Sequence, residues 1–200
     1  MIILDQLSNK LAAVMVEENI IKEEEAAVYA YTFDAFLEQC FYWSTLLLIG
    51  AILHQFVSSL IFLLVLFPLR SYAGGIHAPS SQLCIIFSYG IYFGVLFIAP
   101  RIPFTPSPFW WILCGMELFV VSTLAPVNTP NRHFSPSQKK TMQTKCRIIC
   151  LLIYIFFSVL CYFHFKIYYS IIIVCVTIML AGQFAGILHN RQYQREEKQT

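Results

Sequence analysis

Long apolar stretches without a charged residue dominate the chain. No Asp, Glu, Lys or Arg occurs within 39–69, 71–100, 148–165 or 167–190. A run of about 18 or more mostly apolar residues is long enough to cross a bilayer as a helix, whereas membrane β-barrels show shorter, alternating segments. The pattern therefore predicts an all-α, polytopic integral membrane protein with about six transmembrane helices.

The number of helices depends on 39–69, which allows two interpretations. As one helix its 31 residues would reach about 46 Å, well beyond a hydrocarbon core about 30 Å thick. A hairpin that turns between Gly50 and Gln55 fits better, because His54 and Gln55 would be costly at the bilayer centre. The hairpin gives six transmembrane helices, and a single tilted helix gives the alternative of five.

Prolines and charges divide the rest of the chain. A helix pair is predicted over 81–125, with an external loop at about 100–108 that contains four prolines. A basic loop follows at 126–147, then a second hairpin at 148–188 and a polar tail at 189–200. These boundaries leave 70–80 as a short loop between the first hairpin and the helix pair.

The N-terminal part, 1–38, differs from the rest because it carries eight of the eleven acidic residues. Leu4, Leu7, Leu11 and Val14 recur at helical spacing, and a second helix is expected over 23–37. We therefore expect an amphipathic, acidic, interfacial helical region that lies against the membrane or a partner.

The basic residues indicate the orientation of the chain. Loop 126–147 has five bases and no acid, and loops rich in Lys and Arg face the cytoplasm. The segment 70–80 is separated from this loop by one helix pair, so it is expected on the same cytoplasmic side.

That cytoplasmic segment and the start of the next helix form the sequence RSYAGGIHAPSSQLC, residues 70–84. Gly74 and Gly75 permit backbone angles that other residues resist, and Pro79 suits the first turn of a helix. Cys84 should therefore fall in the first turn or two of that helix, with His77 just before it.

A cysteine and a histidine in this arrangement suggest nucleophilic catalysis. A helix N-terminus favours a thiolate, and an adjacent imidazole favours it further. The thiolate would be the nucleophile, and the imidazole could return a proton to a leaving amine. The segment is either such a cysteine hydrolase or acyl-transfer centre, or only a glycine-rich turn with a solvated histidine and a buried cysteine.

Other kinds of chemistry find little support in the chain. It has no His-Glu-x-x-His, no Gly-x-Ser-x-Gly and no phosphate-binding glycine loop. None of its seven cysteines forms a Cys-x-x-Cys pair, so no metal site is predicted, and neither is a cofactor or a nucleic-acid partner. Glu117 lies in an apolar helix, where an acid is either functional or the partner of a polar neighbour.

The pattern R-x-x-x-G-G-x-H-A-P-S-S-x-x-C in a polytopic chain of 200 residues, with a later APVNTP before a basic loop, resembles the accessory gene regulator B (AgrB) family. The resemblance implies a bacterial plasma-membrane cysteine endopeptidase that works as a homodimer and matures a quorum-sensing pheromone from an AgrD-like precursor. It implies His77 and Cys84 as catalytic residues, with Arg70, Gly74 and Gly75 as supporting positions. The acidic N-terminus resembles the family less.

The resemblance also implies the order of events. Cys84 would attack the bond before the precursor's acidic C-terminal tail, and the precursor's own side chain would then close a thiolactone or lactone ring. Lys139, Lys140 and Lys145 would bind the tail. Two alternatives remain: membrane proteolysis with water as acceptor, and a non-enzymatic transporter or assembly factor in which 70–84 is only a turn.

Overall fold

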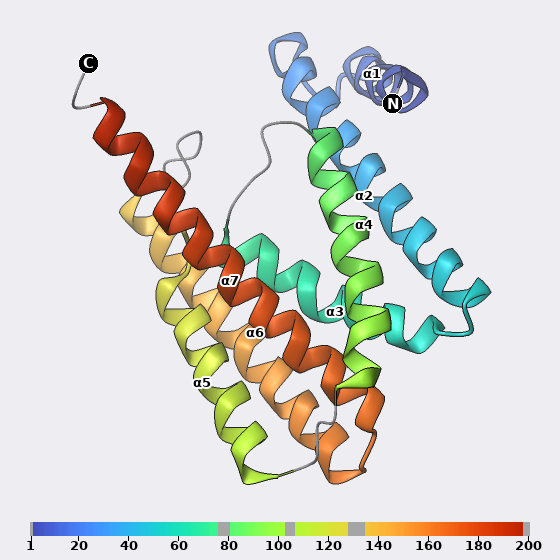
Figure 1. The fold of residues 1–200 in the computed structure, drawn as a ribbon. Coiled ribbons are helices and arrows are strands. Elements are labelled where there is room, and N and C mark those ends of the chain that lie inside the picture. The colour runs from blue at the N-terminus through green and yellow to red at the C-terminus, as the bar shows by residue number, and fades with distance from the viewer. Residues whose placement is uncertain (1, 76–80, 103–106, 128–134, 198–200) are drawn as a thin grey trace. The chain divides into compact units, whose positions relative to one another are not determined.

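The computed structural model describes residues 2–75, 81–102, 107–127 and 135–197, and the regular structure in these ranges is entirely helical (Figure 1). Five of the described helices are long and apolar enough to cross a membrane. A further apolar helix, α5, has 17 residues. The predicted class, an all-α polytopic membrane protein, is therefore confirmed.

The helices follow one another along the chain with short connections. They are α1 (Ile2–Glu17), the 3-10 turn η1 (Glu23–Glu25), α2 (Ala26–Ile52), α3 (Phe56–Ala73), α4 (Ser81–Ile98), the 3-10 turn η2 (Ala99–Arg101), α5 (Pro108–Leu124), α6 (Pro136–Tyr162) and α7 (Lys166–Glu197). The chain divides into two compact units, residues 1–56 and 57–200.

The first unit consists of α1 packed against α2. On α1, Ser8 and Ala12 are buried, whereas Leu7, Leu11 and Val14 are 44%, 39% and 53% exposed. The apolar stripe expected from the sequence is thus exposed, which suits a helix that lies in a membrane interface.

Helix α2 differs from the sequence-based expectation. A separate helix over 23–37 and a first transmembrane helix from residue 39 were expected. Instead, the 3-10 turn Glu23–Glu25 leads into one helix, Ala26–Ile52, which runs through the expected boundary near residue 38. The reason is local: the helix contains no proline, and its one glycine, Gly50, lies near its end. The turn between α2 and α3 does fall at 53–55, as the hairpin interpretation required.

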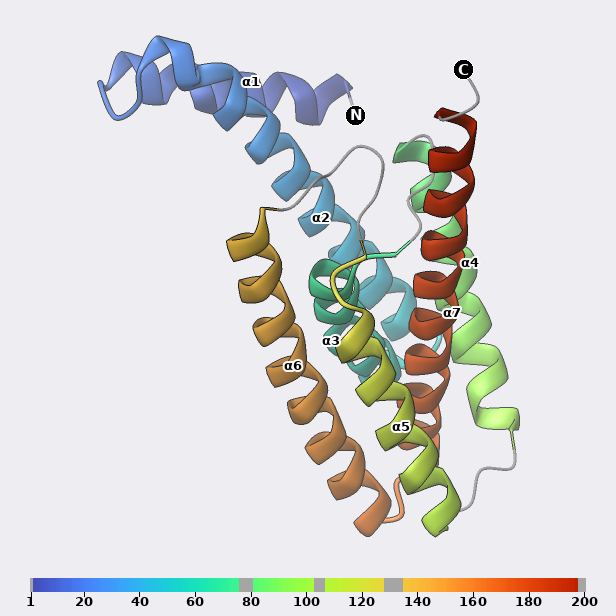
Figure 2. The same ribbon diagram turned by 90° about the vertical axis from the view of Figure 1, so that its left-hand side faces the viewer.

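The second unit is built around α5, α6 and α7, which lie side by side in both views (Figures 1 and 2). Phe157 of α6 is fully buried, and its ring centroid lies 6.3 Å from that of Tyr169 on α7 and 6.4 Å from that of Trp111 on α5. Helices α3 and α4 are joined by a buried hydrogen bond of 2.7 Å between Ser59 and Tyr92.

Two of the described helices extend beyond the predicted transmembrane segments. The basic segment 126–147 was expected to be a loop, but α6 begins at Pro136. Proline suits a first helical position, and Ser135 and Gln138 form a capping box that starts the helix. The last predicted hairpin was expected to end at residue 188, with a polar tail from 189, and α7 continues into this tail as far as Glu197.

Two histidines end helices in the same way. His54 and His164 have φ of 55° and 58°, and each follows the end of a helix by two residues. The amide of the next residue donates to a carbonyl five positions earlier, Gln55 to Gly50 at 2.7 Å and Phe165 to Leu160 at 3.0 Å. This is the Schellman arrangement, so both histidines serve as helix caps.

Candidate active site

The sulfur of Cys84 lies beside the guanidinium group of Arg70. Arg70 is in the last turn of α3 and Cys84 in the first turn of α4. Arg70 Nη2 donates a hydrogen bond to Cys84 Sγ at 3.4 Å, and the pair is partly buried. A guanidinium group is always positively charged, so this contact suits a sulfur that carries negative charge during reaction.

The two glycines after α3 pass close to other backbone segments. Gly74 and Gly75 have φ of +73° and +150°, a range that L side chains rarely adopt. A Cβ on Gly74 would lie 2.9 Å from the oxygen of Val127, and one on Gly75 would lie 3.5 Å from the oxygen of Gly182 on α7. Gly74 is therefore required both by its backbone angle and by the approach of Val127.

The end of α3 is tied to both of these neighbours. The amide of Val127 donates to the carbonyl of Ala73 at 3.0 Å. The fully buried amide of Gln183, on α7, donates to the same carbonyl at 3.2 Å and to that of Val121 on α5, also at 3.2 Å. The end of α3, residues 121–127 and α7 are far apart in sequence and thus meet at Ala73, directly before the glycine pair.

The predicted catalytic histidine, His77, lies outside the described residues, as does Pro79. Of the remaining predicted site residues, the structure brings Arg70 into contact with Cys84 and places Gly74 directly after the turn that carries Arg70. The histidine–cysteine pair therefore stays a prediction.

The lysines lie on the first turns of α6. Lys139, Lys140 and Lys145 are all exposed. Lys145 Nζ lies 5.8 Å from the ring centroid of Tyr72, within the range of a cation–π contact. Because Tyr72 is two residues before Gly74, this contact places the basic end of α6 beside the end of α3.

Glu117, in the second unit, is not among the residues that contact Arg70 or Cys84. Glu117 of α5 accepts hydrogen bonds from Thr177 of α7, 3.0 and 3.2 Å from its two carboxylate oxygens, so the polar neighbour considered from the sequence is present.

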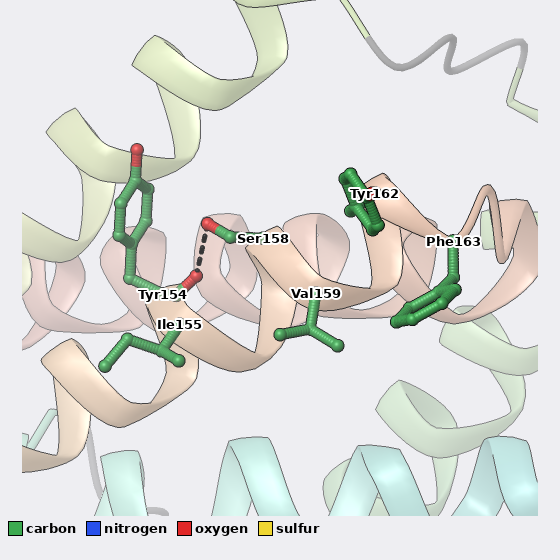
Figure 3. A pocket seen from close by; sticks show the side chains of 6 residues that line it. All are labelled: Tyr154, Ile155, Ser158, Val159, Tyr162 and Phe163. Atoms are coloured by element: carbon green, nitrogen blue, oxygen red, sulfur yellow. Dashed lines mark hydrogen bonds between the residues drawn. The ribbon is translucent and has the colours of Figure 1, made fainter.

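An open, apolar groove of about 340 Å³ runs along α6, lined by Tyr154, Ile155, Ser158, Val159, Tyr162 and Phe163 (Figure 3). Apart from its two tyrosines, the lining has one hydroxyl group, that of Ser158, which donates to the carbonyl of Tyr154 at 2.8 Å. None of the side chains that line the groove is charged. Among the described residues no group of three or more His, Cys, Asp or Glu side chains could hold a metal ion.

Sequence reasoning missed Gln183 and Val127, and it gave Arg70 no specific contact. A signal for Gln183 was present, because it is the only amide side chain in the apolar run 167–188. A buried amide in such a run requires hydrogen-bonding partners. Nothing in the sequence identified those partners, since they are backbone carbonyls of α3 and α5.

The chain was compared with known proteins. It matches the family described as accessory gene regulator B over residues 8–182. It is 27% identical over 163 residues to a Clostridium perfringens (strain SM101) protein named "Putative AgrB-like protein", covering 78% of this chain and 76% of the relative. With "Putative AgrB-like protein 2" of C. perfringens strain 13, the identity is 26% over the same length and shares. No solved structure matches.

Proposed function

The chain belongs to the accessory gene regulator B family, and from this premise we propose that it is a membrane cysteine endopeptidase. Its substrate is a small AgrD-type quorum-sensing precursor, from which it removes the C-terminal tail. The observation that carries the proposal is the 3.4 Å contact between Arg70 Nη2 and Cys84 Sγ, because it gives a motif cysteine a fixed positive partner at a helix N-terminus.

The first chemical step is acylation of the enzyme. The Cys84 thiolate attacks the carbonyl carbon of the bond before the tail, and a tetrahedral intermediate forms. Amides in the first turn of α4 have no partner within the helix, so they can stabilise its oxyanion. As the C–N bond breaks, His77 gives the leaving amine the proton that it took from the Cys84 thiol. The tail departs, and the precursor remains as a thioester on Cys84.

The second step is ring closure. A thiol or hydroxyl of the precursor attacks the thioester carbonyl, and His77 takes the proton from this nucleophile. The C–S bond to Cys84 then breaks and restores the thiolate. The product is a thiolactone if the precursor's nucleophile is sulfur and a lactone if it is oxygen. Water in place of this nucleophile would give simple proteolysis.

Arg70 is placed to hold the sulfur in both steps. Its guanidinium group stays charged throughout, and the sulfur carries negative charge before acylation and again after ring closure. A hydrogen bond to a charged acceptor is stronger than one to a neutral acceptor. The contact therefore places a positive donor beside the sulfur at both ends of the cycle.

The basic start of α6 is proposed to bind the acidic tail of the precursor. Lys139, Lys140 and Lys145 are exposed, and the Lys145–Tyr72 contact keeps this charge beside the end of α3. Exposed charges of opposite sign orient a partner more than they tighten its binding.

Basic residues are enriched in cytoplasmic segments, so we place the site at the cytoplasmic face of a bacterial plasma membrane. The family resemblance alone supports a homodimer as the working state.

A precursor that lacks its own nucleophile gives the decisive experiment. Such a precursor can be cleaved but cannot cyclise, so it should lose its tail and accumulate on the enzyme. The adduct should map to Cys84 by mass spectrometry, and hydroxylamine should release it, as expected for a thioester. Cys84→Ser and His77→Ala should both lose most tail release with the protein still in the membrane.

The matched control is another cysteine. Cys175→Ala removes a fully buried thiol from α7, and it should keep tail release because Cys175 only packs. If tail release persists in Cys84→Ala, the endopeptidase proposal fails. The segment 70–84 would then be only a turn.

A further inference from the structure

Gln183 is an unusual residue for the interior of this helix bundle. Its side chain is fully buried within α7, and its amide nitrogen donates to the carbonyls of Ala73 and Val121, both at 3.2 Å. Carbonyl oxygens only accept hydrogen bonds, so the nitrogen must face them. The other amide atom, Oε1, is buried and has no hydrogen-bond partner among the described residues.

Stability does not explain this residue. The carbonyl of Ala73 also accepts from the Val127 amide at 3.0 Å, and that of Val121 also accepts from the Ala125 amide at 3.1 Å. Removal of Gln183 would therefore leave neither carbonyl unpaired. Its own Oε1, by contrast, is a buried acceptor without a partner in the part of the chain that the structure describes, which costs free energy. An apolar side chain of similar volume would avoid that cost.

The position of the bonds shows where Gln183 can act. Ala73 is the last residue of α3, and the preceding turn carries Arg70, whose carbonyl accepts from the Gly74 amide at 3.3 Å. Arg70 in turn contacts Cys84. Gln183 is thus separated from the nucleophile by one helical turn and one side-chain contact.

We propose that Gln183 is a positioning residue that fixes the last turn of α3 against α5 and α7, and so holds the Arg70 guanidinium group within reach of the Cys84 sulfur. The physical basis is direction. Apolar packing is non-directional, so it lets a terminal turn rotate or shift, whereas a forked pair of hydrogen bonds restricts both. Displacements of about 1 Å at a reacting group can lower turnover by as much as a hundredfold.

The inference rests on the proposed endopeptidase function for its importance, but the contact that it concerns can be tested without turnover. The rate of Cys84 alkylation by iodoacetamide, followed by peptide-resolved mass spectrometry at one fixed pH, reports on the Arg70–Cys84 contact. Wild-type protein, Arg70→Gln, Gln183→Met and the double variant form a double-mutant cycle. Methionine keeps the length and approximate volume of glutamine and removes both polar atoms.

Arg70→Gln should slow alkylation of Cys84, because the charged donor 3.4 Å from the sulfur is lost. Gln183→Met should slow it in the same direction by a smaller factor. In the double variant, Gln183→Met should add no further effect, because its influence passes through Arg70. On tail release, Gln183→Met should lower kcat about tenfold or more and leave KM within about twofold, since no substrate contact is removed.

Matched variants separate positioning from damage to the fold. Met179→Leu changes a buried residue one turn earlier on α7 and should leave alkylation and kcat unchanged. The melting temperature of Gln183→Met should equal or exceed that of the wild type. If this variant does not fold, Gln183→Asn replaces it, because asparagine keeps the amide but is too short to reach both carbonyls.

Two results would overturn the inference. One is a Gln183→Met protein with wild-type values of the alkylation rate and of kcat. The other is a Gln183→Met substitution that slows alkylation by the same factor in the Arg70→Gln background as in the wild type. Failure of the endopeptidase proposal is a separate outcome: tail release would then persist in Cys84→Ala, while the alkylation cycle would still measure the coupling of Gln183 to Arg70.

Discussion

Replacing Gly74 with alanine tests the packing under the site most directly. An alanine there must adopt the φ of +73° found for Gly74, which costs an L residue about 1–2 kcal/mol. Its Cβ would also lie 2.9 Å from the oxygen and 3.1 Å from the nitrogen of Val127. Both are backbone atoms, so the segment itself must move.

The size of the effect follows from these contacts. Movement of Val127 lengthens its 3.0 Å hydrogen bond to Ala73, and loss of such a bond costs about 1 kcal/mol. Alanine restricts the unfolded chain, which returns about 0.4–1 kcal/mol. The net loss in the free energy of unfolding is therefore about 2 kcal/mol. For a chain of this size, that lowers the melting temperature by roughly 4–8 °C.

The assay compares Gly74→Ala with a glycine that has free space. A Cβ on Gly90, in the middle of α4, would meet no described atom within 4 Å. Gly90→Ala should therefore be neutral or raise the melting temperature, because alanine favours a helix by up to about 1 kcal/mol over glycine. Both proteins would be melted in the same detergent and assayed for tail release.

Gly74→Ala should also lose activity beyond its loss of stability, because the displaced turn carries Arg70. Equal melting temperatures for Gly74→Ala and Gly90→Ala, with normal tail release in both, would show that the close approach of Val127 is not required. The conclusion that the end of α3 is held in place by its neighbours would then be wrong.

Three further predictions concern other parts of the chain. The double variant Lys139→Glu, Lys140→Glu should raise KM for tail release several-fold with little change in stability, because exposed charges contribute little to stability. Its KM should also lose the salt dependence of the wild type, because screening acts on exposed charges. An unchanged KM would remove these lysines from tail binding. His164→Gly should raise the free energy of unfolding by about 0.5 kcal/mol, since glycine adopts positive φ without strain, and a destabilised variant in denaturant titrations would contradict the capping role. In intact cells, Lys166→Cys should react with an impermeant maleimide and Ser137→Cys should not; the reverse labelling would invert the proposed topology.

The sequence predicted the helical class and the position of the turn between α2 and α3 because both follow from local pattern. The charge-free runs are too long for strands, and His54 marks a place where a helix cannot continue at the bilayer centre. The start of α6 was also encoded locally, in the capping box of Ser135 and Gln138, but the expectation of a loop gave more weight to the prolines and charges. The continuous α2 was missed for a similar reason: a change in composition near residue 38 does not end a helix.

The contacts of the candidate site could not be predicted in the same way. The Arg70–Cys84 contact joins the ends of two helices, and its distance depends on how those helices pack. Gly74 was identified as a turn residue, but the need for it arises from Val127, more than fifty residues later in the chain. Gln183 lies farther still, and its partners are backbone atoms that carry no sequence signal.

The attachment of the end of α3 to α7 has a consequence for biosynthesis. Residues 70–84 leave the ribosome long before Gly182 and Gln183, and chains are made from the N-terminus at a limited rate. A nascent chain that has inserted only α3 and α4 would contain the motif but not the carbonyl–amide bonds that hold it. Under the proposed endopeptidase function, the protein should therefore be inactive until its last helix enters the membrane, and it should not process a precursor while its own translation is unfinished.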